Sequence, residues 1–374
     1  MINKMTHDSI MQDTIFVSDI HAGRAYEDSS RYWGRPALDV EKGKRMAMHR
    51  IADFIRHSVQ ETRGGVTVCF HGDVADAWDR ALWDKEGRPF DPALARDELL
   101  PLAESLRAVR EVDVLWGNTE EGAMMDRAQY RALFEAGEGS INFQFPAEGL
   151  VWLDADRQLL AIHGDCADPP LHMLQQEAGY QLIPSDIRGI VRMLAKTVLH
   201  ISDNTAEVEQ YLAQALSHDG AETEIRHALW KRNAPRHHEA QTAYMQQQAL
   251  RHRLPFHVKQ WFDSWKGSTV QSAYNGAVLR AVSDLAYRGV VPQIDFVVMG
   301  HTHGQCLWTR RQIREMLSAK QASCSPRYFV NTGSAGGELE SGLCTFGRRR
   351  EAASPELYVA YDPKQPASGV YRLA

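Results

Sequence analysis

The sequence predicts an α/β fold interrupted by a large helical insertion. Short apolar runs alternate with helical patterns over residues 14–168, no strand pattern is found over residues 169–289, and strand patterns return from residue 290 onward. Alternation of this kind is typical of a mostly parallel sheet flanked by helices. Because strands on both sides of the gap are needed to complete the sheet, we expect a core formed by residues 14–168 and 290–374 and an insertion formed by residues 169–289.

Each predicted strand is a short run rich in β-branched or aromatic residues, and each predicted helix repeats apolar residues at helical spacing. Strands are predicted at residues 14–18, 66–70, 112–116, 141–145, 150–154, 158–162, 294–299, 327–330, 357–361 and 370–373. Helices of the core are predicted at residues 40–61, 91–109 and 124–136. Three consecutive arginines at residues 348–350 lie outside these elements, and we expect them to be solvated.

The composition excludes disordered and fibrous classes, because 44% of the residues are hydrophobic and 24% are charged. No apolar run approaches the roughly 20 residues that a membrane helix needs, and no signal peptide is recognisable. The five cysteines are scattered and form no CxxC pair. We therefore expect a cytoplasmic protein without a disulfide framework.

Polar side chains follow five of the predicted strands, at the point where each strand ends. They are Asp19 and His21 after the first strand, Asp73 after the second, Asn118 after the third, His163 after the strand at 158–162, and His301 and His303 after the strand at 294–299. In open α/β sheets, ligands bind at the carboxyl ends of the strands. We therefore expect these side chains to meet at one edge of the sheet.

The residue types and their spacing indicate metal binding. Asp19 and His21 are two positions apart, so in extended backbone both can face one ion, and the two histidines of the last cluster have the same spacing. Carboxylate, imidazole and amide ligands together suit Mn, Fe, Zn, Ni or Co better than Mg or Ca. Seven ligands exceed the four of one tetrahedral ion, so we expect two ions that share a bridging carboxylate.

The same residues lie in five short motifs, DIH, GD, GN, HG and GHTH, which follow successive strands. In this order the motifs resemble those of the calcineurin-like metallophosphoesterases, over residues 14–166 and 290–335 but not over the insertion. The resemblance implies a four-layer α/β/β/α sandwich and a dinuclear metal centre that hydrolyses a phosphate ester, with a metal-bridging hydroxide as nucleophile. The N-T-G-S sequence at 331–334 resembles the loop that closes the metal site in this family.

The resemblance also implies a role for each motif residue, with two divalent transition metals as cofactors and manganese favoured among them. Asp19, His21 and His303 would bind the first metal, Asn118, His163 and His301 the second, and Asp73 both. The candidate catalytic residues are Asp73, Asn118, His163 and Thr119.

The chain departs from the family pattern at Thr119. The motif that usually reads G-N-H-D/E is Gly117-Asn118-Thr119-Glu120 here. The missing histidine normally contacts the phosphoryl oxygen and helps to protonate the leaving group, whereas a threonine cannot supply a proton near pH 7. Members without this histidine tend to cleave diesters or pyrophosphates, so we expect such a bond in a nucleotide or nucleotide-sugar substrate. Glu120 and His71 are candidate supporting residues, and His71 or a residue of the insertion is a candidate for the missing acid.

The motifs also separate branches of this family. Asp73 is followed by VADAW rather than by a DRG-containing motif, which argues against Ser/Thr protein phosphatases. The pattern is nearest to that of the pyrophosphohydrolases that cleave UDP-2,3-diacylglucosamine, which also lack the histidine and carry a helical insertion, although a much shorter one. This resemblance indicates the type of reaction more than the substrate.

The insertion carries two basic features. A helical pattern over residues 186–201 places Arg188 and Arg192 opposite the apolar face. Residues 226–259 hold seven basic residues and one acid, interleaved with aromatic residues, in a chain of net charge −6. Arg188, Arg192, Arg232 and Arg236, with Arg24 beside the first motif, are candidate substrate contacts. The alternative is that these features are a solvated ridge and a helical hairpin.

Two other functions stay open at this point. A nuclease would use the basic insertion to grip single-stranded DNA or RNA, and such binding weakens steeply with salt. A non-catalytic, metal-stabilised scaffold is the second alternative, although no ligand position of the motifs is lost. The partner expected first is a small phosphate ester or nucleotide conjugate.

Overall fold

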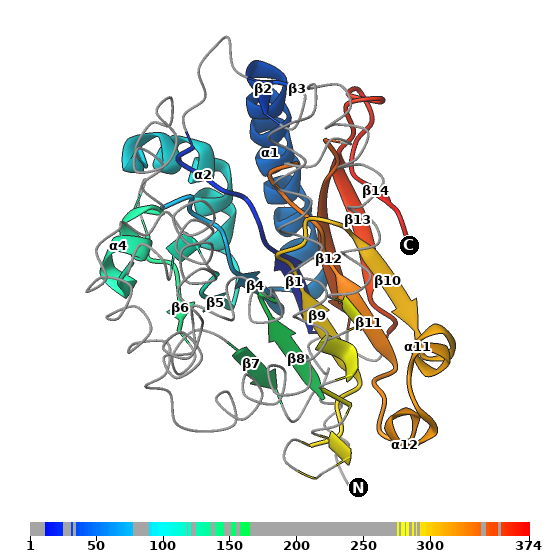
Figure 1. The fold of residues 1–374 in the computed structure, drawn as a ribbon. Helices are drawn as coiled ribbons and strands as arrows, with labels where there is room; N and C mark the ends of the chain where they lie inside the picture. The colour runs from blue at the N-terminus through cyan, green and yellow to red at the C-terminus, as the bar shows by residue number, and fades with distance from the viewer. Residues whose placement is uncertain are drawn as a thin grey trace, which may run out of the picture.

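A computed structural model describes most of the predicted core, and Figure 1 shows two β-sheets with helices beside them. The described residues are 12–24, 31–32, 35–77, 90–117, 119–120, 125–135, 139–145, 151–154, 158–164, 275–276, 278–280, 282–283, 286–287, 289, 292–337, 342–350 and 353–374.

The larger sheet has seven strands in the order β14-β13-β12-β1-β4-β5-β6. Its strands are β1 (Asp13–Val17), β4 (Val66–His71), β5 (Glu111–Leu115), β6 (Phe143–Gln144), β12 (Cys344–Arg350), β13 (Glu356–Tyr361) and β14 (Tyr371–Arg372). Strands β1, β4, β5 and β6 are parallel, whereas β12 pairs antiparallel with β1 and leads to β13 and β14. The parallel half therefore presents the carboxyl ends of neighbouring strands at one edge.

The smaller sheet has five strands in the order β10-β11-β9-β8-β7. Its strands are β7 (Val151–Asp154), β8 (Leu159–Ile162), β9 (Phe296–Met299), β10 (Cys306–Thr309) and β11 (Tyr328–Asn331). The three central strands are parallel, and β7 and β10 close the two edges in antiparallel pairing. Strands β8 and β9 are neighbours although the insertion separates them in the sequence.

The described helices belong mainly to the connections between strands. They are α1 (Ala37–Thr62), α2 (Pro92–Leu106), α4 (Arg127–Ala132), α11 (Arg310–Met316) and α12 (Ala319–Ala322), and a short hairpin of β2 (Arg31–Tyr32) and β3 (Arg35–Pro36) precedes α1. Asp91 caps α2 by accepting hydrogen bonds from two amides of its first turn. Residues 275–276, 278–280, 282–283 and 286–287 are also helical.

The alternation of side chains along each strand divides the core between three packing surfaces. In β1, Ile15 and Val17 pack in a cluster with α1 and α2, whereas Phe16 packs in a cluster that contains residues of both sheets. In β9, Phe296 and Val298 face that same inter-sheet cluster. The opposite face of β9 packs against Val278 of the helical residues and against α11. Both faces of the central strands are thus buried, which explains their continuous apolar sequence.

The structure confirms an α/β fold with two sheets, and it corrects one expectation from the sequence. The central strands of each sheet bury one face against helices and the other against the opposite sheet. The arginines at 348–350 are not a solvated run but the end of β12. Arg348 is 4% exposed and pairs with the buried Asp13 of β1, an interaction that offsets the cost of burying its charge.

The predicted insertion lies almost entirely outside the described residues, so the division into core and insertion stays a prediction. Its described residues 275–276, 278–280, 282–283 and 286–287 are helical, as expected. None of the helices in the described part of the chain combines the length and the apolarity that crossing a bilayer requires.

The packing between α1 and the larger sheet leads to a stability prediction. Ile51 of α1 is completely buried in the cluster with α2 and the sheet, so Ile51→Ala should lower the free energy of unfolding by about 2–5 kcal/mol. His57→Ala on the same helix is the control: the side chain of His57 is 69% exposed, and its removal should change stability by no more than about 0.5 kcal/mol. Chemical denaturation measures both, and equal midpoints would contradict the packing described here.

Candidate metal centre

Two groups of aspartate and histidine side chains lie at the carboxyl ends of the parallel strands. The loops after β1, β4, β8 and β9 carry them. The first group is Asp19, His21 and His303, and the second group is Asp73, His163 and His301. In each group, one ligand atom from every residue lies within 4.8 Å of the others, so each group could hold a metal ion.

The first group brings together the loops after β1 and β9. The Nε2 atom of His303 lies 3.2 Å from Oδ1 of Asp19 and 3.4 Å from Nε2 of His21. Asp19 is fully buried and His21 almost so, whereas His303 is partly exposed. The group is therefore buried on the protein side and accessible through His303.

Asp73 lies between the two groups and offers one carboxylate oxygen to each. Its Oδ1 is 3.5 Å from Nε2 of His163, and its Oδ2 is 3.7 Å from Nε2 of His21. The ring of His301 lies edge-on to that of His163, with 5.1 Å between the ring centroids. A carboxylate in this position can bind two ions at once.

The histidines keep both central carboxylates ionised. Burial raises the pKa of Asp19, but the charge and hydrogen bond of His303, together with the charge of His163, lower it to about 2. Burial also raises the pKa of Asp73, whereas His163, His21 and the amide of Thr119 lower it, and the resulting pKa lies well below the usual range. Negative charge is thus concentrated between imidazole rings.

The chemistry of these groups fits divalent cations. The Nδ1 atom of His163 lies 3.0 Å from the carbonyl oxygen of His71 and must donate, since a carbonyl only accepts. In the neutral ring, Nε2 of His163 then carries a lone pair and faces the carboxylate of Asp73. The Oδ1 atom of Asp19 is buried and accepts no hydrogen bond from the described residues. Lone pairs that face one another in a buried site are costly unless a cation lies between them.

The backbone of these loops adopts an uncommon conformation. Seven described residues other than glycine have a positive φ, and five of them belong to the two groups: Asp19, His21, Asp73, His301 and His303. Their φ angles lie between 51° and 64°, in the left-handed region, which costs about 1–3 kcal/mol for each residue. Backbone hydrogen bonds hold two of the loops together, from the amide of Asp19 to the carbonyl of Gly72 and from that of His21 to the carbonyl of Asp73.

Glu120 holds the loop after β4 against the loop after β5. Its Oε2 accepts hydrogen bonds from the amides of Asp73 and Gly117, and its Oε1 accepts one from the amide of Ala75. Burial and the charge of Asp73 raise the pKa of Glu120 to about 7, against the lowering effect of these amides. The hydroxyl of Thr119 also donates to Oε2, at 3.4 Å. A supporting role for Glu120 stays a prediction.

Thr119, at the position of the missing histidine, is turned into the protein. Its side-chain oxygen lies 2.8 Å from Oδ1 of Asp73 and 2.7 Å from the carbonyl oxygen of Ala75, and its amide also donates to Asp73. The residue is 1% exposed. The hydroxyl and the amide of Thr119 therefore both face the carboxylate of Asp73 and orient it. Asn118, the remaining predicted ligand, lies outside the described residues.

His71, at the end of β4, contacts both His163 and the loop at 331–334. Its Nε2 lies 2.9 Å from the hydroxyl of Thr332, and its carbonyl oxygen accepts from His163. The side chain is fully buried, and burial lowers its pKa to about 4. A general acid must hold its proton near neutral pH, so this environment favours support over proton donation.

The loop at 331–334 binds backbone groups beside the two groups. Asn331 donates to the carbonyl of Gly300, and Ser334 donates to the carbonyl of Asp19. These bonds hold the histidine-bearing loop after β9 against the loop after β1.

Of the arginines predicted to contact the substrate, the structure describes Arg24. Arg24 is 6% exposed and forms an ion pair with Asp76, whose Oδ1 lies 3.7 Å from Nδ1 of His21. Contact of Arg24 with a substrate stays a prediction, but its described role is to hold a carboxylate beside His21. The other candidates, Arg188, Arg192, Arg232 and Arg236, lie outside the described residues.

Sequence reasoning missed Asp76, and it also missed Lys44 and Glu98, which pair beneath the His21 loop. Lys44 interrupts the apolar stripe of α1, and Glu98 interrupts that of α2. A charged residue on the buried face of a helix was the available signal for both.

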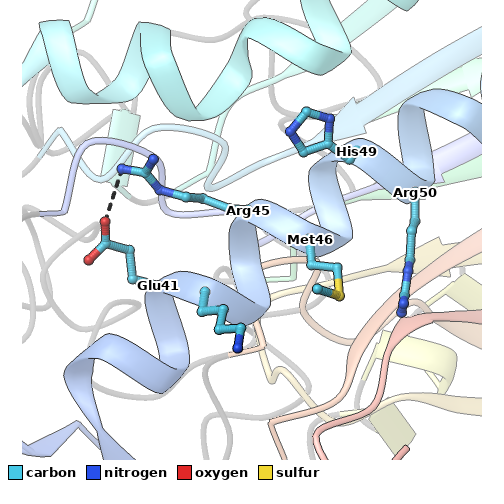
Figure 2. A pocket seen from close by; sticks show the side chains of 6 residues that line it. Glu41, Arg45, Met46, His49 and Arg50 are labelled. Atoms are coloured by element: carbon cyan, nitrogen blue, oxygen red, sulfur yellow. Dashed lines mark hydrogen bonds and ion pairs between the residues drawn. The ribbon is translucent and has the colours of Figure 1, made fainter. Parts of the chain in front are cut away.

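A hollow on the outer face of α1 is separate from these groups. Figure 2 shows its lining, with Glu41 and Arg45 joined as an ion pair and Met46, His49 and Arg50 beside them. The lining of this hollow includes none of the residues of the two groups.

No protein-family model matches the chain, and a comparison with curated proteins found no match.

The close approach of two loops at Gly117 leads to a second prediction. A Cβ atom at this position would lie 2.2 Å from Oδ1 and 2.3 Å from the amide nitrogen of Asp73. Gly117→Ala should therefore displace Asp73 and lower the free energy of unfolding by about 1–3 kcal/mol. Gly369→Ala is the matched control, since a Cβ there meets nothing within 4 Å. Denaturation midpoints that are the same for both variants would show that the loops are not in contact.

Proposed function

We propose that this chain is a calcineurin-like metallophosphoesterase that hydrolyses phosphodiester or pyrophosphate bonds with two divalent transition metals. The position of Asp73 carries the proposal, because its two oxygens face histidines of two different groups. A buried carboxylate shared in this way serves two cations and is otherwise costly. The two mixed sheets, with helices packed on their outer faces, also agree with the four-layer sandwich that the resemblance implies.

The described residues support a specific division of the ligands. The first group would hold one ion and the second group the other, with Asp73 shared and Asn118 completing the second set. Manganese suits this mixture of carboxylate and imidazole, as do Fe, Zn, Ni and Co. When bound, such a pair lowers the pKa of water and stabilises charge on both the attacking and the leaving oxygen of a displacement.

The protein's own residues prepare this site in three ways. The carbonyl of His71 fixes the ring of His163 so that its Nε2 faces Asp73. Thr119 orients the shared carboxylate through Oδ1. Asp76 lies beside Nδ1 of His21 at 3.7 Å and favours a ring whose Nε2 is directed to the first group.

The environment of Thr119 supports a diester or anhydride as substrate. The hydroxyl of Thr119 lies against Asp73 and Ala75 and cannot donate a proton near pH 7. A phosphate or nucleotide leaving group needs less protonation than a simple alcohol. The proposed substrate is therefore a nucleotide or nucleotide-sugar conjugate, over which the insertion would act as a cap.

Hydrolysis of bis(4-nitrophenyl) phosphate by the full-length protein with Mn²⁺ tests the proposed activity. Asp73→Asn and His163→Ala should lower the rate by at least about 100-fold, because each removes a ligand of the proposed metal pair. His57→Ala should keep the full rate, and a chelator should abolish it. Full activity of Asp73→Asn would rule out the proposal, and turnover that Asp73→Asn abolishes would rule out a non-catalytic scaffold.

The leaving group provides a separate test of the role of Thr119. Without a proton donor, the rate with a series of aryl phosphodiesters should fall steeply as the pKa of the leaving phenol rises. The steady-state rate for each ester measures this dependence. A flat dependence would show that another residue protonates the leaving group. Adding nucleotide sugars and single-stranded DNA to the panel separates the proposed substrates from the nuclease alternative.

A further inference from the structure

A buried ion pair joins α1 and α2 beneath the loop that carries His21. The Nζ atom of Lys44 lies 3.0 Å from Oε1 of Glu98 and 3.1 Å from its Oε2. The side chain of Lys44 is 1% exposed and that of Glu98 is fully buried. Neither residue belongs to the two metal groups.

Both members of the pair also bind the backbone of the His21 loop. Lys44 donates from Nζ to the carbonyl oxygen of His21 at 2.9 Å, and Glu98 accepts at Oε2 from the amide of Gly23 at 2.8 Å. His21 has a φ of 51° and Gly23 a φ of 84°. The pair thus satisfies buried backbone groups on both sides of a turn that is held in the left-handed region.

Burial of this pair is not explained by stability alone. Two charges that leave water lose more solvation than their attraction returns unless the geometry is excellent, and apolar residues of similar volume often serve as well. The neighbouring buried positions of α1 and α2, such as Met48 and Leu102, are apolar. A charged pair can bind backbone amides and carbonyls, which apolar side chains cannot do. Here the pair binds the backbone of the loop that carries His21.

We propose that Lys44 and Glu98 are positioning residues that set the first metal group by clamping the His21 loop. The inference rests on the proposed function, because it assigns a role toward the metal that His21 would bind. The pair is electrically neutral, so it fixes the loop without adding net charge beside the ion.

The pair binds the loop of the first group directly, whereas other contacts hold the second group. The ring of His163 in the second group is fixed by the carbonyl of His71, and Asp73 is held by Glu120 and Thr119. None of these contacts involves Lys44 or Glu98. Loss of the pair should therefore weaken the first metal and leave the second unchanged.

Titration of the full-length protein with Co²⁺ tests this inference, with binding followed by equilibrium dialysis and by visible absorption. The variant K44M/E98L replaces both charges with apolar side chains of similar size. We expect this variant to bind one equivalent of Co²⁺ as tightly as the wild type and the other equivalent at least about 10-fold more weakly. Removing residues that hold metal ligands typically weakens metal binding by about 10- to 100-fold. Its spectrum with one equivalent should match that of His21→Ala and differ from that of His163→Ala.

A second buried ion pair provides the matched control. Nε of Arg348 lies 2.9 Å from Oδ2 of Asp13, at the opposite end of β1 from Asp19, and both side chains are buried. R348M/D13L removes this pair and should leave both Co²⁺ affinities unchanged. If K44M/E98L does not fold, E98Q takes its place, since it keeps the size of the side chain and removes the charge that balances Lys44.

The outcomes separate the inference from the proposed function. Three outcomes would overturn the positioning role but leave the two-metal site of the wild type standing. They are tight binding of both Co²⁺ equivalents by K44M/E98L, equal weakening of both equivalents in that variant, and the same weakening in R348M/D13L. Binding of fewer than two equivalents by the wild type would overturn the proposed function and this inference with it.

Discussion

Left-handed turns at the carboxyl ends of parallel strands are the constraint on which the rest of the site depends. Asp19, His21, Asp73, His301 and His303 all have positive φ angles, a conformation that L-residues avoid. These turns persist because neighbouring loops hold them through backbone hydrogen bonds and buried side chains. The consequence is that the ligand side chains are aimed inward by the fold itself, before any ion binds.

The electrostatics of the assembled groups suits cations. Two carboxylates with lowered pKa values face imidazole nitrogens in a buried setting. The charged residues around them are paired with one another, Arg24 with Asp76 and Lys44 with Glu98. The unbalanced charge is thus left at Asp19 and Asp73, where positive ions would compensate it.

Much of this site could be predicted from the sequence because a strand end is a local feature. The apolar runs located β1, β4, β8 and β9, and the polar residues that follow them are the ones that the structure brings together. What local pattern could not show is which neighbours fix a loop. Glu120 joins two loops through backbone amides, and Arg348 was expected in solvent but pairs with Asp13. Such contacts join segments far apart in sequence, and β12 was missed because its last three residues are arginines.

The central claim is that the two groups bind two ions that share Asp73. An anomalous difference map from crystals of the protein grown with Mn²⁺ tests it most directly. We expect two peaks, one among Asp19, His21 and His303 and one among Asp73, His163 and His301, with a carboxylate oxygen of Asp73 next to each. A single peak, or peaks away from these side chains, would contradict the account.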